Sequence, residues 1–277
     1  MLALLDADII AYRCAATANH DPEWVATSRC NTLVEQILEE VKADSYQLFL
    51  SGPVNFRKKI YPAYKANRVQ PPPVHLLLCK QFLETKWGAV WTDGYEADDA
   101  LGIEQCRVGT ARLPKAIIAA DGTTVSEGLK PNAPSCTTII CSIDKDLKQI
   151  PGLHYNFVKK EFDEVSVEQG WRSFYTQVLV GDASDNVKGC PGIGKAKAPR
   201  ILAGCESEQE MFEAVRATYN DDDNMFINGQ LLYILREENV YWNYMQFVPD
   251  ASNPNPSQNS LNEEAVQKDI NLSVTNV

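Results

Sequence analysis

The stretch that decides the fold is "TTIICSID", residues 137–144, together with its N-terminal counterpart "LALLDADII", residues 2–10. Each is a continuous apolar run that leads directly into aspartate. Such runs predict strands that are buried on both faces, the pattern of a parallel sheet. In the N-terminal run, the two-residue period of a strand places Asp6 and Asp8 on one face. The second run ends at Asp144, and Asp146 follows two residues later.

Shorter apolar runs at 45–52, 89–91 and 153–158 predict further strands, and amphipathic stretches at 27–44 and 75–87 predict helices between them. This alternation predicts an α/β fold with a mostly parallel sheet. From residue 166 the pattern becomes helical, with predicted helices within 166–182, 197–205, 207–219 and 229–244.

The chain is therefore expected to have three regions. These are an α/β core over 1–165 that includes a basic segment at about 53–75, a helical module over 166–247, and a polar tail over 248–277 whose composition predicts flexibility. Residues 109–136, rich in Gly, Pro and Ser, are expected to form a loop or small insertion, and the sequence assigns them no role.

Composition excludes several classes of protein. The chain has 277 residues, 44% hydrophobic and 23% charged, which is typical of a soluble globular protein. Its eight cysteines form no C-x-x-C pair and it has three histidines, so a structural zinc site is not expected. The scattered cysteines are expected to be reduced thiols of a cytoplasmic protein. The apolar N-terminus meets Asp6 too early for a signal peptide, and no run approaches the roughly 20 apolar residues of a membrane helix.

The formal net charge of −11, taken alone, argues against a nucleic-acid partner. The basic residues are nevertheless concentrated in two stretches of the sequence. "NFRKKIYPAYKANR" (55–68) holds five of them and "NVKGCPGIGKAKAPR" (186–200) holds four, and neither stretch contains an acid. A chain with segregated charge can bind an anion at one place and cations at another.

The acids also gather, in four short groups. Two follow the strands quoted above, one is "GYEADD" (94–99), and one is "GDASD" (181–185) with Asp182 and Asp185. Ligands of open α/β sheets bind beyond the carboxyl ends of the strands. If the four groups meet there, their mutual repulsion calls for a hard cation, and oxygen ligands select Mg²⁺ or Mn²⁺.

Simpler interpretations stay open for each acidic group alone. An acid after a strand is commonly a turn residue, and acids at a helix start offset the macrodipole. "DDDNMFING" (221–229) fails the EF-hand pattern because its fifth and sixth positions are Met225 and Phe226, and it is expected to be a solvated loop.

"GCPGIGKA" (189–196) nearly matches the phosphate-binding P-loop, but Ala196 stands where the P-loop needs a hydroxyl. We expect instead a helix–hairpin–helix. Gly192 and Gly194 would form its turn, Ile193 would pack inward, and a helix starting at Lys195 would direct its N–H groups at a phosphate. An ordinary basic helix start remains the alternative.

Taken together, these motifs resemble the phage-type 5′-nucleases, the family of flap endonucleases and 5′→3′ exonucleases. The resemblance spans roughly residues 4–205 and rests on "LLDADIIAYR", "NFRKKIYPAYKANR", "GYEADD", "CSIDKDLKQIPG" and "GDASDNVKGCPGIGKAKA", in family order. It implies a Mg²⁺-dependent phosphodiesterase with an α/β nuclease core, a helical arch and a C-terminal helix–three-turn–helix DNA-binding module.

The resemblance also implies roles for residues. Two Mg²⁺ or Mn²⁺ ions would be held by Asp6, Glu96, Asp98, Asp99, Asp144, Asp146, Asp182 and Asp185. Lys65 and Arg68 would be catalytic. DNA would be bound by Arg57, Tyr64, Lys65, Arg68, Lys188, Gly192, Gly194, Lys195 and Lys197, with a K⁺ ion at the hairpin carbonyls. Many family members carry an acid just before the arch, where this chain has Ser51 and Gly52.

The sequence thus predicts a 5′-nuclease acting on DNA ends or flaps, with replication proteins such as a polymerase as possible partners. Two alternatives remain open. A PIN-like ribonuclease would also use clustered acids but would not need the basic hairpin at 188–200. A non-catalytic, structure-specific DNA-binding protein would use the acids to hold a structural ion.

Overall fold

The computed structural model describes residues 1–110, 117–118, 124–125, 137–219 and 221–247. The chain divides into two compact units, Met1–Trp242 and Asn243–Val277. The first unit contains the sheet and the helices discussed below. Of the second, the structure describes a short 3-10 helix, Tyr244–Phe247.

The main sheet has six strands in the order β3-β2-β1-β6-β7-β8. All neighbouring strands are parallel except β7 and β8, which are antiparallel. Their bounds are β1 Leu2–Asp6, β2 Ser45–Leu50, β3 Val90–Trp91, β6 Thr138–Cys141, β7 Gly152–Asn156 and β8 Glu161–Val165. The predicted α/β fold with a mostly parallel sheet is confirmed.

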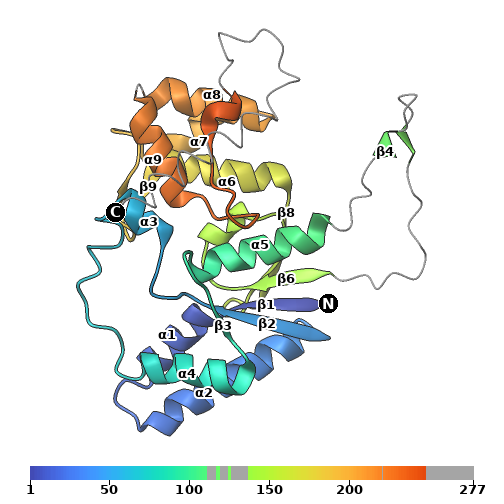
Figure 1. Cartoon of the computed structure of the whole chain (residues 1–277), viewed down its shortest axis with the longest axis vertical. Coiled ribbons are helices and arrows are strands. Elements are labelled where there is room, and N and C mark those ends of the chain that lie inside the picture. Colours follow the sequence, from blue (N-terminus) through green and yellow to red (C-terminus); the bar gives the residue numbers. More distant parts are fainter. Residues whose placement is uncertain (111–116, 119–123, 126–136, 220, 248–277) are drawn as a thin grey trace. The chain divides into compact units, whose positions relative to one another are not determined.

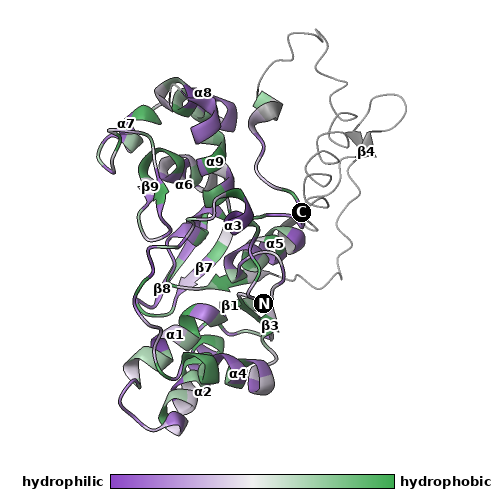
Figure 2. Ribbon diagram, turned by 60° about the vertical axis from the view of Figure 1, so that its left-hand side comes forward, coloured by the Kyte–Doolittle hydropathy of each residue, from purple (hydrophilic) through white to green (hydrophobic). Residues whose placement is uncertain are grey.

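Helices cover both faces of this sheet (Figure 1). Ala3 and Leu5 of β1 pack in the core formed with α1 (Ala7–Thr17), α2 (Glu23–Glu40) and α4 (Leu76–Trp87), whereas Leu4 packs in the core formed with α5 (Ala97–Thr110). All three side chains are fully buried, which explains why the strand is apolar without alternation. The surrounding helices carry both hydrophilic and hydrophobic residues (Figure 2).

The order of the strands reverses at the centre of the sheet. The chain moves outward from β1 to β2 and β3, then returns to place β6 on the other side of β1. Asp6 ends β1 and Asp144 follows β6, so both acids lie at the carboxyl edge of this switch point. This is the position where open α/β sheets bind their ligands.

The prediction that Asp6 and Asp8 share one face of a strand is wrong. The strand ends at Asp6, whose carboxylate accepts a hydrogen bond from Ile9 N at 3.0 Å and caps α1. Because an N-cap aspartate satisfies a backbone N–H of the first turn, the helix begins at Ala7 and takes Asp8 into that turn. The Asp8 carboxylate instead accepts from Ser51 N at the end of β2, at 2.9 Å.

The C-terminal part of the first unit is mostly helical. It contains α6 (Val167–Val180), the hairpin of β9 (Gly181–Asp182) and β10 (Val187–Lys188), α7 (Ala198–Ile201), α8 (Glu208–Tyr219) and α9 (Asp222–Leu232). α6 packs against α8 and against the 3-10 turn Asp146–Gln149 that follows β6. The expected domain boundary at 165/166 lies inside this compact unit and stays a prediction.

Two predictions in this part are wrong. The solvated loop expected at 221–229 is instead the start of α9, because the Asp221 carboxylate accepts from Asn224 N at 3.1 Å and the following acids lie in the first turn. The helix expected over 229–244 ends at Leu232, where the carbonyls of Leu232 and Tyr233 accept from the side chains of Gln149 and Arg57.

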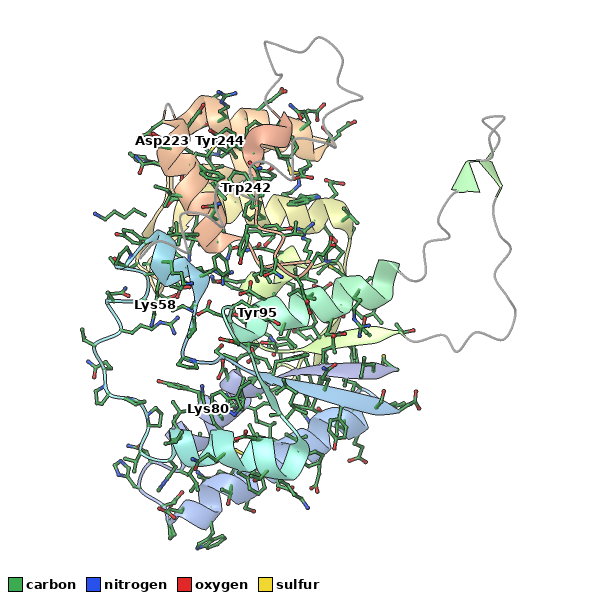
Figure 3. The ribbon with its side chains drawn as sticks, viewed as in Figure 1. Lys58, Lys80, Tyr95, Asp223, Trp242 and Tyr244 are labelled. Atoms are coloured by element: carbon green, nitrogen blue, oxygen red, sulfur yellow. The ribbon has the colours of Figure 1, made fainter. Side chains whose placement is uncertain are left out.

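Within the basic segment 53–75, one short helix forms, α3 (Phe56–Ile60). In Figure 3, Lys58 marks α3 and Lys80 marks α4, the helix that follows this segment. Of the expected insertion 109–136, the structure describes the end of α5 and the paired strands β4 (Ile117–Ile118) and β5 (Thr124–Val125). The expected tail 248–277 lies outside the described residues. Among the helices that are described, none combines the length and apolarity needed to cross a membrane.

A buried ion pair joins α3 to the core. The Arg57 guanidinium, 3% exposed, donates to both oxygens of Asp99, which is fully buried, at 2.6 and 2.8 Å. Arg57 also donates to the carbonyls of Leu231 (2.9 Å) and Tyr233 (2.6 Å), and Asp99 accepts from Leu235 N at 3.0 Å. The guanidinium of Arg57 is thus enclosed and bonded inside the protein, and its expected contact with DNA stays a prediction.

We predict that Arg57→Met and Asp99→Ala each lower the free energy of unfolding by about 3–5 kcal/mol, because each leaves one charge buried without its partner. Urea unfolding followed by circular dichroism measures this. Lys148→Met, which removes an exposed ion pair with Asp163 at 2.7 Å, is the matched control and should cost under about 1 kcal/mol. Equal losses in all three variants would contradict the prediction.

Candidate metal centre and nucleic-acid interface

A chain of hydrogen bonds fixes the acids at the carboxyl edge of β1 and β6. The Ser142 hydroxyl donates to Asp6 Oδ2 at 2.7 Å and accepts from Asp144 N at 3.0 Å. Asp144 Oδ1 in turn accepts from Asp146 N at 2.8 Å. Asp6 and Asp144 are therefore oriented by a neighbouring hydroxyl and a neighbouring backbone N–H, respectively.

The three acids of "GYEADD" point in different directions from the first turn of α5. Asp99 enters the core and binds Arg57. Asp98 lies near the sheet edge, since Asp6 and Asp144 are the acids that act on it most strongly. Glu96 turns toward the basic segment, where its oxygens meet Lys65 and Tyr64. Both oxygens of Asp99 accept from Arg57, and its predicted role as a metal ligand stays a prediction.

Burial raises the pKa values of three acids at the sheet edge. Burial raises the pKa of Asp6 to about 7, with smaller contributions from Asp8 and Asp144. Burial, and then the charges of Asp6 and Asp144, raise the pKa of Asp98 well above its usual value. Burial and Asp144 raise the pKa of Asp146 to about 6. These carboxyls would all ionise readily only with a cation among them.

The other acids already have cationic or polar partners. Burial alone would raise the pKa of Glu96, but Arg57 and Lys65 hold that pKa below its usual value. Burial opposes ionisation of Asp182 too, but hydrogen bonds from Ser184 lower its pKa. Lys145 lies 2.6 Å from Asp146 and 3.5 Å from Asp182, so it bridges the two.

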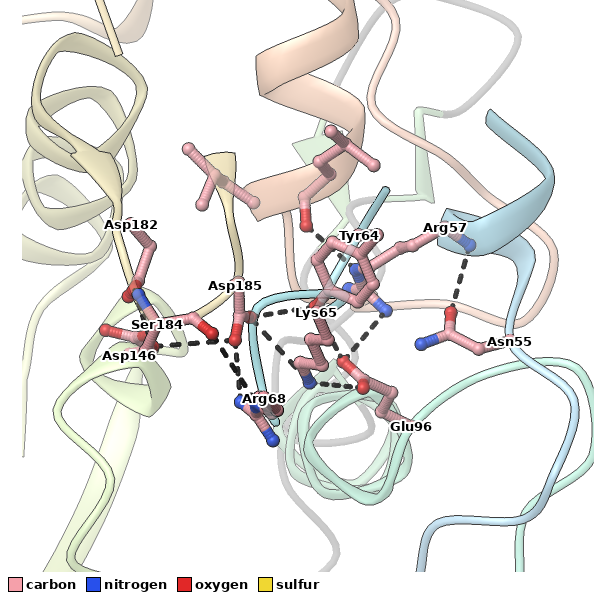
Figure 4. Close-up of polar contacts among 12 residues, drawn as sticks. Asn55, Arg57, Tyr64, Lys65, Arg68, Glu96, Asp146, Asp182, Ser184 and Asp185 are labelled. Atoms are coloured by element: carbon pink, nitrogen blue, oxygen red, sulfur yellow. Dashed lines mark hydrogen bonds and ion pairs between the residues drawn. The ribbon is translucent and has the colours of Figure 1, made fainter. Parts of the chain in front are cut away.

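The basic segment is held against the β9–β10 hairpin (Figure 4). Arg68 Nη2 lies 2.7 Å from Asp185 Oδ1, and Lys65 Nζ lies 3.7 Å from Asp185 Oδ2. The Tyr64 hydroxyl lies 3.0 Å from Glu96 Oε2 and 2.9 Å from Asp185 Oδ2. Tyr64 is only 3% exposed and links two acids, and its predicted contact with DNA stays a prediction.

The donor set suits a hard divalent cation. The candidate ligands are carboxylates, with no histidine or cysteine among them, which favours Mg²⁺ or Mn²⁺ over zinc. The raised pKa values of buried Asp6 and Asp98 show that positive charge would be stabilising there. Among the residues that the structure describes, however, no three such side chains are already grouped as a ligand set. The predicted metal ligands thus stay predictions.

The glycine loop after β10 is exposed on its basic side. Gly192 has a φ of +75°, a left-handed conformation that favours glycine, and a side chain there would meet open space. Lys188 and Lys195 are exposed, while Lys197 Nζ donates to Gly192 O at 2.9 Å. The helix expected from Lys195 begins at Ala198 and has four residues, so the N-terminus predicted to face a phosphate is absent at Lys195.

Sequence reasoning missed several residues that complete the site. Ser142 orients Asp6, and Gln177 of α6 donates to Asp146. Ser184 donates to Asp182 at 2.7 Å from its backbone. Ser142 and Ser184 each lie within two residues of a predicted ligand, which is a signal the sequence offers. Gln177 is 31 residues away from Asp146, and only the fold brings them together.

Comparison with known proteins finds relatives among bacterial DNA polymerases I. No protein-family model matches the chain. The chain is 33% identical over 160 residues to DNA polymerase I of Rhizobium leguminosarum, which is 53% of this chain and 14% of that protein. It is 27% identical over 223 residues to the thermostable DNA polymerase I of Thermus filiformis, which is 76% of this chain and 24% of that protein. The chain thus spans a quarter or less of the length of these curated relatives.

Solved structures of similar fold come from bacteriophage T5. They include its 5′-exonuclease with divalent zinc ions bound (TM-score 0.58, 15% identity) and its flap endonuclease in a pseudo-enzyme–product complex with DNA and metal ions (TM-score 0.57, 14% identity). Each alignment covers 83% of this chain and 88% of the T5 chain. The resemblance to the phage-type 5′-nucleases is confirmed at the level of the fold.

We predict a pH-dependent stability from Asp6 when no divalent cation is added. Its folded carboxyl keeps a proton up to about pH 7, whereas the unfolded one loses it near 3.8, so the folded state binds more protons in between. The contribution of this group to the free energy of unfolding therefore falls as pH rises from about 4 to 7. Asp6→Asn should remove this contribution to the fall, and its free energy of unfolding at pH 8 should exceed that of the wild type by about 1–2 kcal/mol.

Urea titrations in EDTA from pH 4.5 to 8 would measure this. Asp163→Asn changes an exposed acid of β8 and should keep the wild-type slope above pH 5. The prediction fails if the free energy of unfolding of Asp6→Asn falls with pH as steeply as that of the wild type.

Proposed function

We propose that this chain is a divalent-metal-dependent 5′-nuclease that hydrolyses DNA phosphodiester bonds at 5′ ends or at 5′ flaps. One observation carries the proposal. On the fold of the T5 nucleases, buried carboxylates with raised pKa values lie at the sheet's switch point, and a cationic segment lies directly against a neighbouring acid, Glu96. The proposed ligands are Asp6, Glu96, Asp98, Asp144, Asp146, Asp182 and Asp185.

Mg²⁺ is the proposed physiological cofactor, with Mn²⁺ as a substitute. Two such ions, when bound, would lower the pKa of a water and stabilise the negative charge on the leaving oxygen. The protein's part is to orient the carboxylates: Ser142 aims Asp6, and the backbone N–H of Asp146 aims Asp144. Burial of Asp6 keeps water from screening that charge.

Lys65 and Arg68 are the proposed electrostatic catalysts. Both lie on the basic segment and point toward the acids (Figure 4), and Arg68 keeps 57% of its side chain exposed. A phosphate that approaches the acids would meet these two cations, which would stabilise the charge that develops during hydrolysis. No nucleophilic side chain is required by this scheme.

The loop at 188–197 is the proposed contact with the duplex. Its glycines leave the backbone open, and Lys188 and Lys195 extend into solvent. Such a loop holds phosphates without selecting bases. A K⁺ ion at the hairpin would have to share Gly192 O with the ammonium of Lys197, which already occupies it. Replication proteins are further proposed partners.

Cleavage of 5′-labelled duplex and flap DNA tests the function. We expect activity with Mg²⁺, none in EDTA, and a loss of about 10³-fold in Asp98→Asn, because several kcal/mol of charge stabilisation would be lost. Asp163→Asn is the control that changes an acid outside the site. An inactive, folded wild type that binds DNA tightly in EDTA would instead indicate a structure-specific binding protein, and a preference for RNA cleavage would indicate a ribonuclease.

The affinity for duplex DNA should depend only modestly on salt, because the acidic chain offers few exposed cations in two patches. Lys195→Ala should reduce the slope of log affinity against log salt by about 1. Fluorescence anisotropy in EDTA between about 50 and 300 mM KCl measures the slope. Lys148→Ala should leave the slope unchanged. A wild-type slope of about ten, which implies about that many phosphate contacts, would contradict the two-patch picture.

A further inference from the structure

Lys65 lies between two of the proposed metal ligands. Its ammonium binds Glu96 Oε1 and lies 3.7 Å from Asp185 Oδ2. These acids come from separate elements, the start of α5 and the β9–β10 turn, and the ammonium is a cation between them. With 19% of its side chain exposed, Lys65 is largely enclosed by the site.

The backbone around Lys65 is also hydrogen-bonded to the β9–β10 hairpin. Lys65 N donates to Asp185 O at 2.9 Å, Asn67 Nδ2 donates to Ala183 O at 2.6 Å, and Asn186 Nδ2 donates to Ala63 O at 2.9 Å. Lys65 itself has a φ of +58°, a left-handed conformation that is strained for a non-glycine residue. The contacts with the hairpin hold this conformation, so its release would also relieve strain.

The site is therefore divided by charge. Asp6 accepts hydrogen bonds from two uncharged donors, Ile9 N and the Ser142 hydroxyl, whereas Glu96 and Asp185 already have the ammonium of Lys65 beside them. This division gives a physical reason why no ready-made ligand set forms among the described residues. The acids that could complete it are held by ammonium and guanidinium groups instead.

We propose that Lys65 is an internal cation that occupies the second divalent-metal position, so that the site binds its two ions in order. The first ion binds at Asp6, Asp98 and Asp144. The second binds between Glu96 and Asp185 only after Lys65 leaves. The proposal rests on the proposed nuclease function, in which a substrate phosphate would draw Lys65 and Arg68 away and so couple arrival of DNA to completion of the metal centre.

Titration of the whole chain with Mn²⁺ alone, followed by electron paramagnetic resonance of the free ion, tests the order. The wild type should bind one Mn²⁺ and then a second at least about tenfold more weakly. Lys65→Met keeps the length of the stem and removes the charge. It should strengthen the second binding step about tenfold and leave the first unchanged, a shift of about 1.4 kcal/mol.

Lys148→Met, which frees an acid remote from the site, should titrate as the wild type does. Two equal sites in the wild type would overturn the proposal, as would a second step that Lys65→Met does not strengthen. Lys65→Gln, which keeps a hydrogen-bond donor but no charge, should behave as Lys65→Met and guards against a folding defect. Since the titration contains no DNA, its result is independent of the cleavage assay, and a failure of cleavage alone would refute only the nuclease function.

Limited trypsin digestion of the wild type gives an independent readout. Cleavage after Lys65 and Arg68 should be slow in EDTA and should accelerate at Mn²⁺ concentrations that fill the second site, whereas cleavage after exposed Lys58 and Lys59 should not change. Equal rates after Lys65 with and without saturating Mn²⁺ would overturn the proposal.

Discussion

The arrangement of the site depends on the buried pair of Arg57 and Asp99. This pair holds α3, the first turn of α5 and residues 231–235 at one point, through two ionic contacts and the backbone groups around them. Asp99 also accepts from Glu96 N at 2.9 Å, so it fixes the turn that carries the other two acids of "GYEADD". With Asp99 anchored inward, Asp98 is placed at the sheet edge and Glu96 at the basic segment.

A buried ion pair is a costly way to stabilise a fold, because two charges must leave water. Its use here is explained by the position it occupies. An apolar contact would let α3 and α5 slide or rotate against each other. The guanidinium of Arg57 bonds one carboxylate and two carbonyls at once, and this set of directional bonds permits one arrangement of the two helices. The candidate metal ligands and the basic segment lie on or beside the two helices that this pair joins. The pair therefore also fixes the positions of these residues.

The features that the sequence predicted correctly are those that depend on local pattern. The buried strands and the sheet edge could be read because a continuous apolar run that ends in an acid is typical of a strand covered on both faces. Prediction failed where one side chain redirects the backbone: Asp6 starts a helix at once, and Asp221 converts an acidic run into α9. Arg57 and Tyr64 were assigned to DNA, since composition gives no sign that an acid 42 residues away, or one 121 residues away, would bind them.

The charges of the site explain how an acidic chain can act on a polyanion. With Arg57 and Asp99 neutralising each other, seven candidate ligands face Lys65, Arg68 and Lys145, which leaves four formal negative charges. That charge equals in magnitude that of two divalent ions, and it rises to five once Lys65 leaves the site. A substrate phosphate that draws Lys65 and Arg68 to itself leaves the carboxylates more negative at the moment when the ions are needed. Lys65 and Arg68 would thus stabilise the acids when no substrate is bound. By moving to the substrate phosphate, they would strengthen metal binding when it is bound.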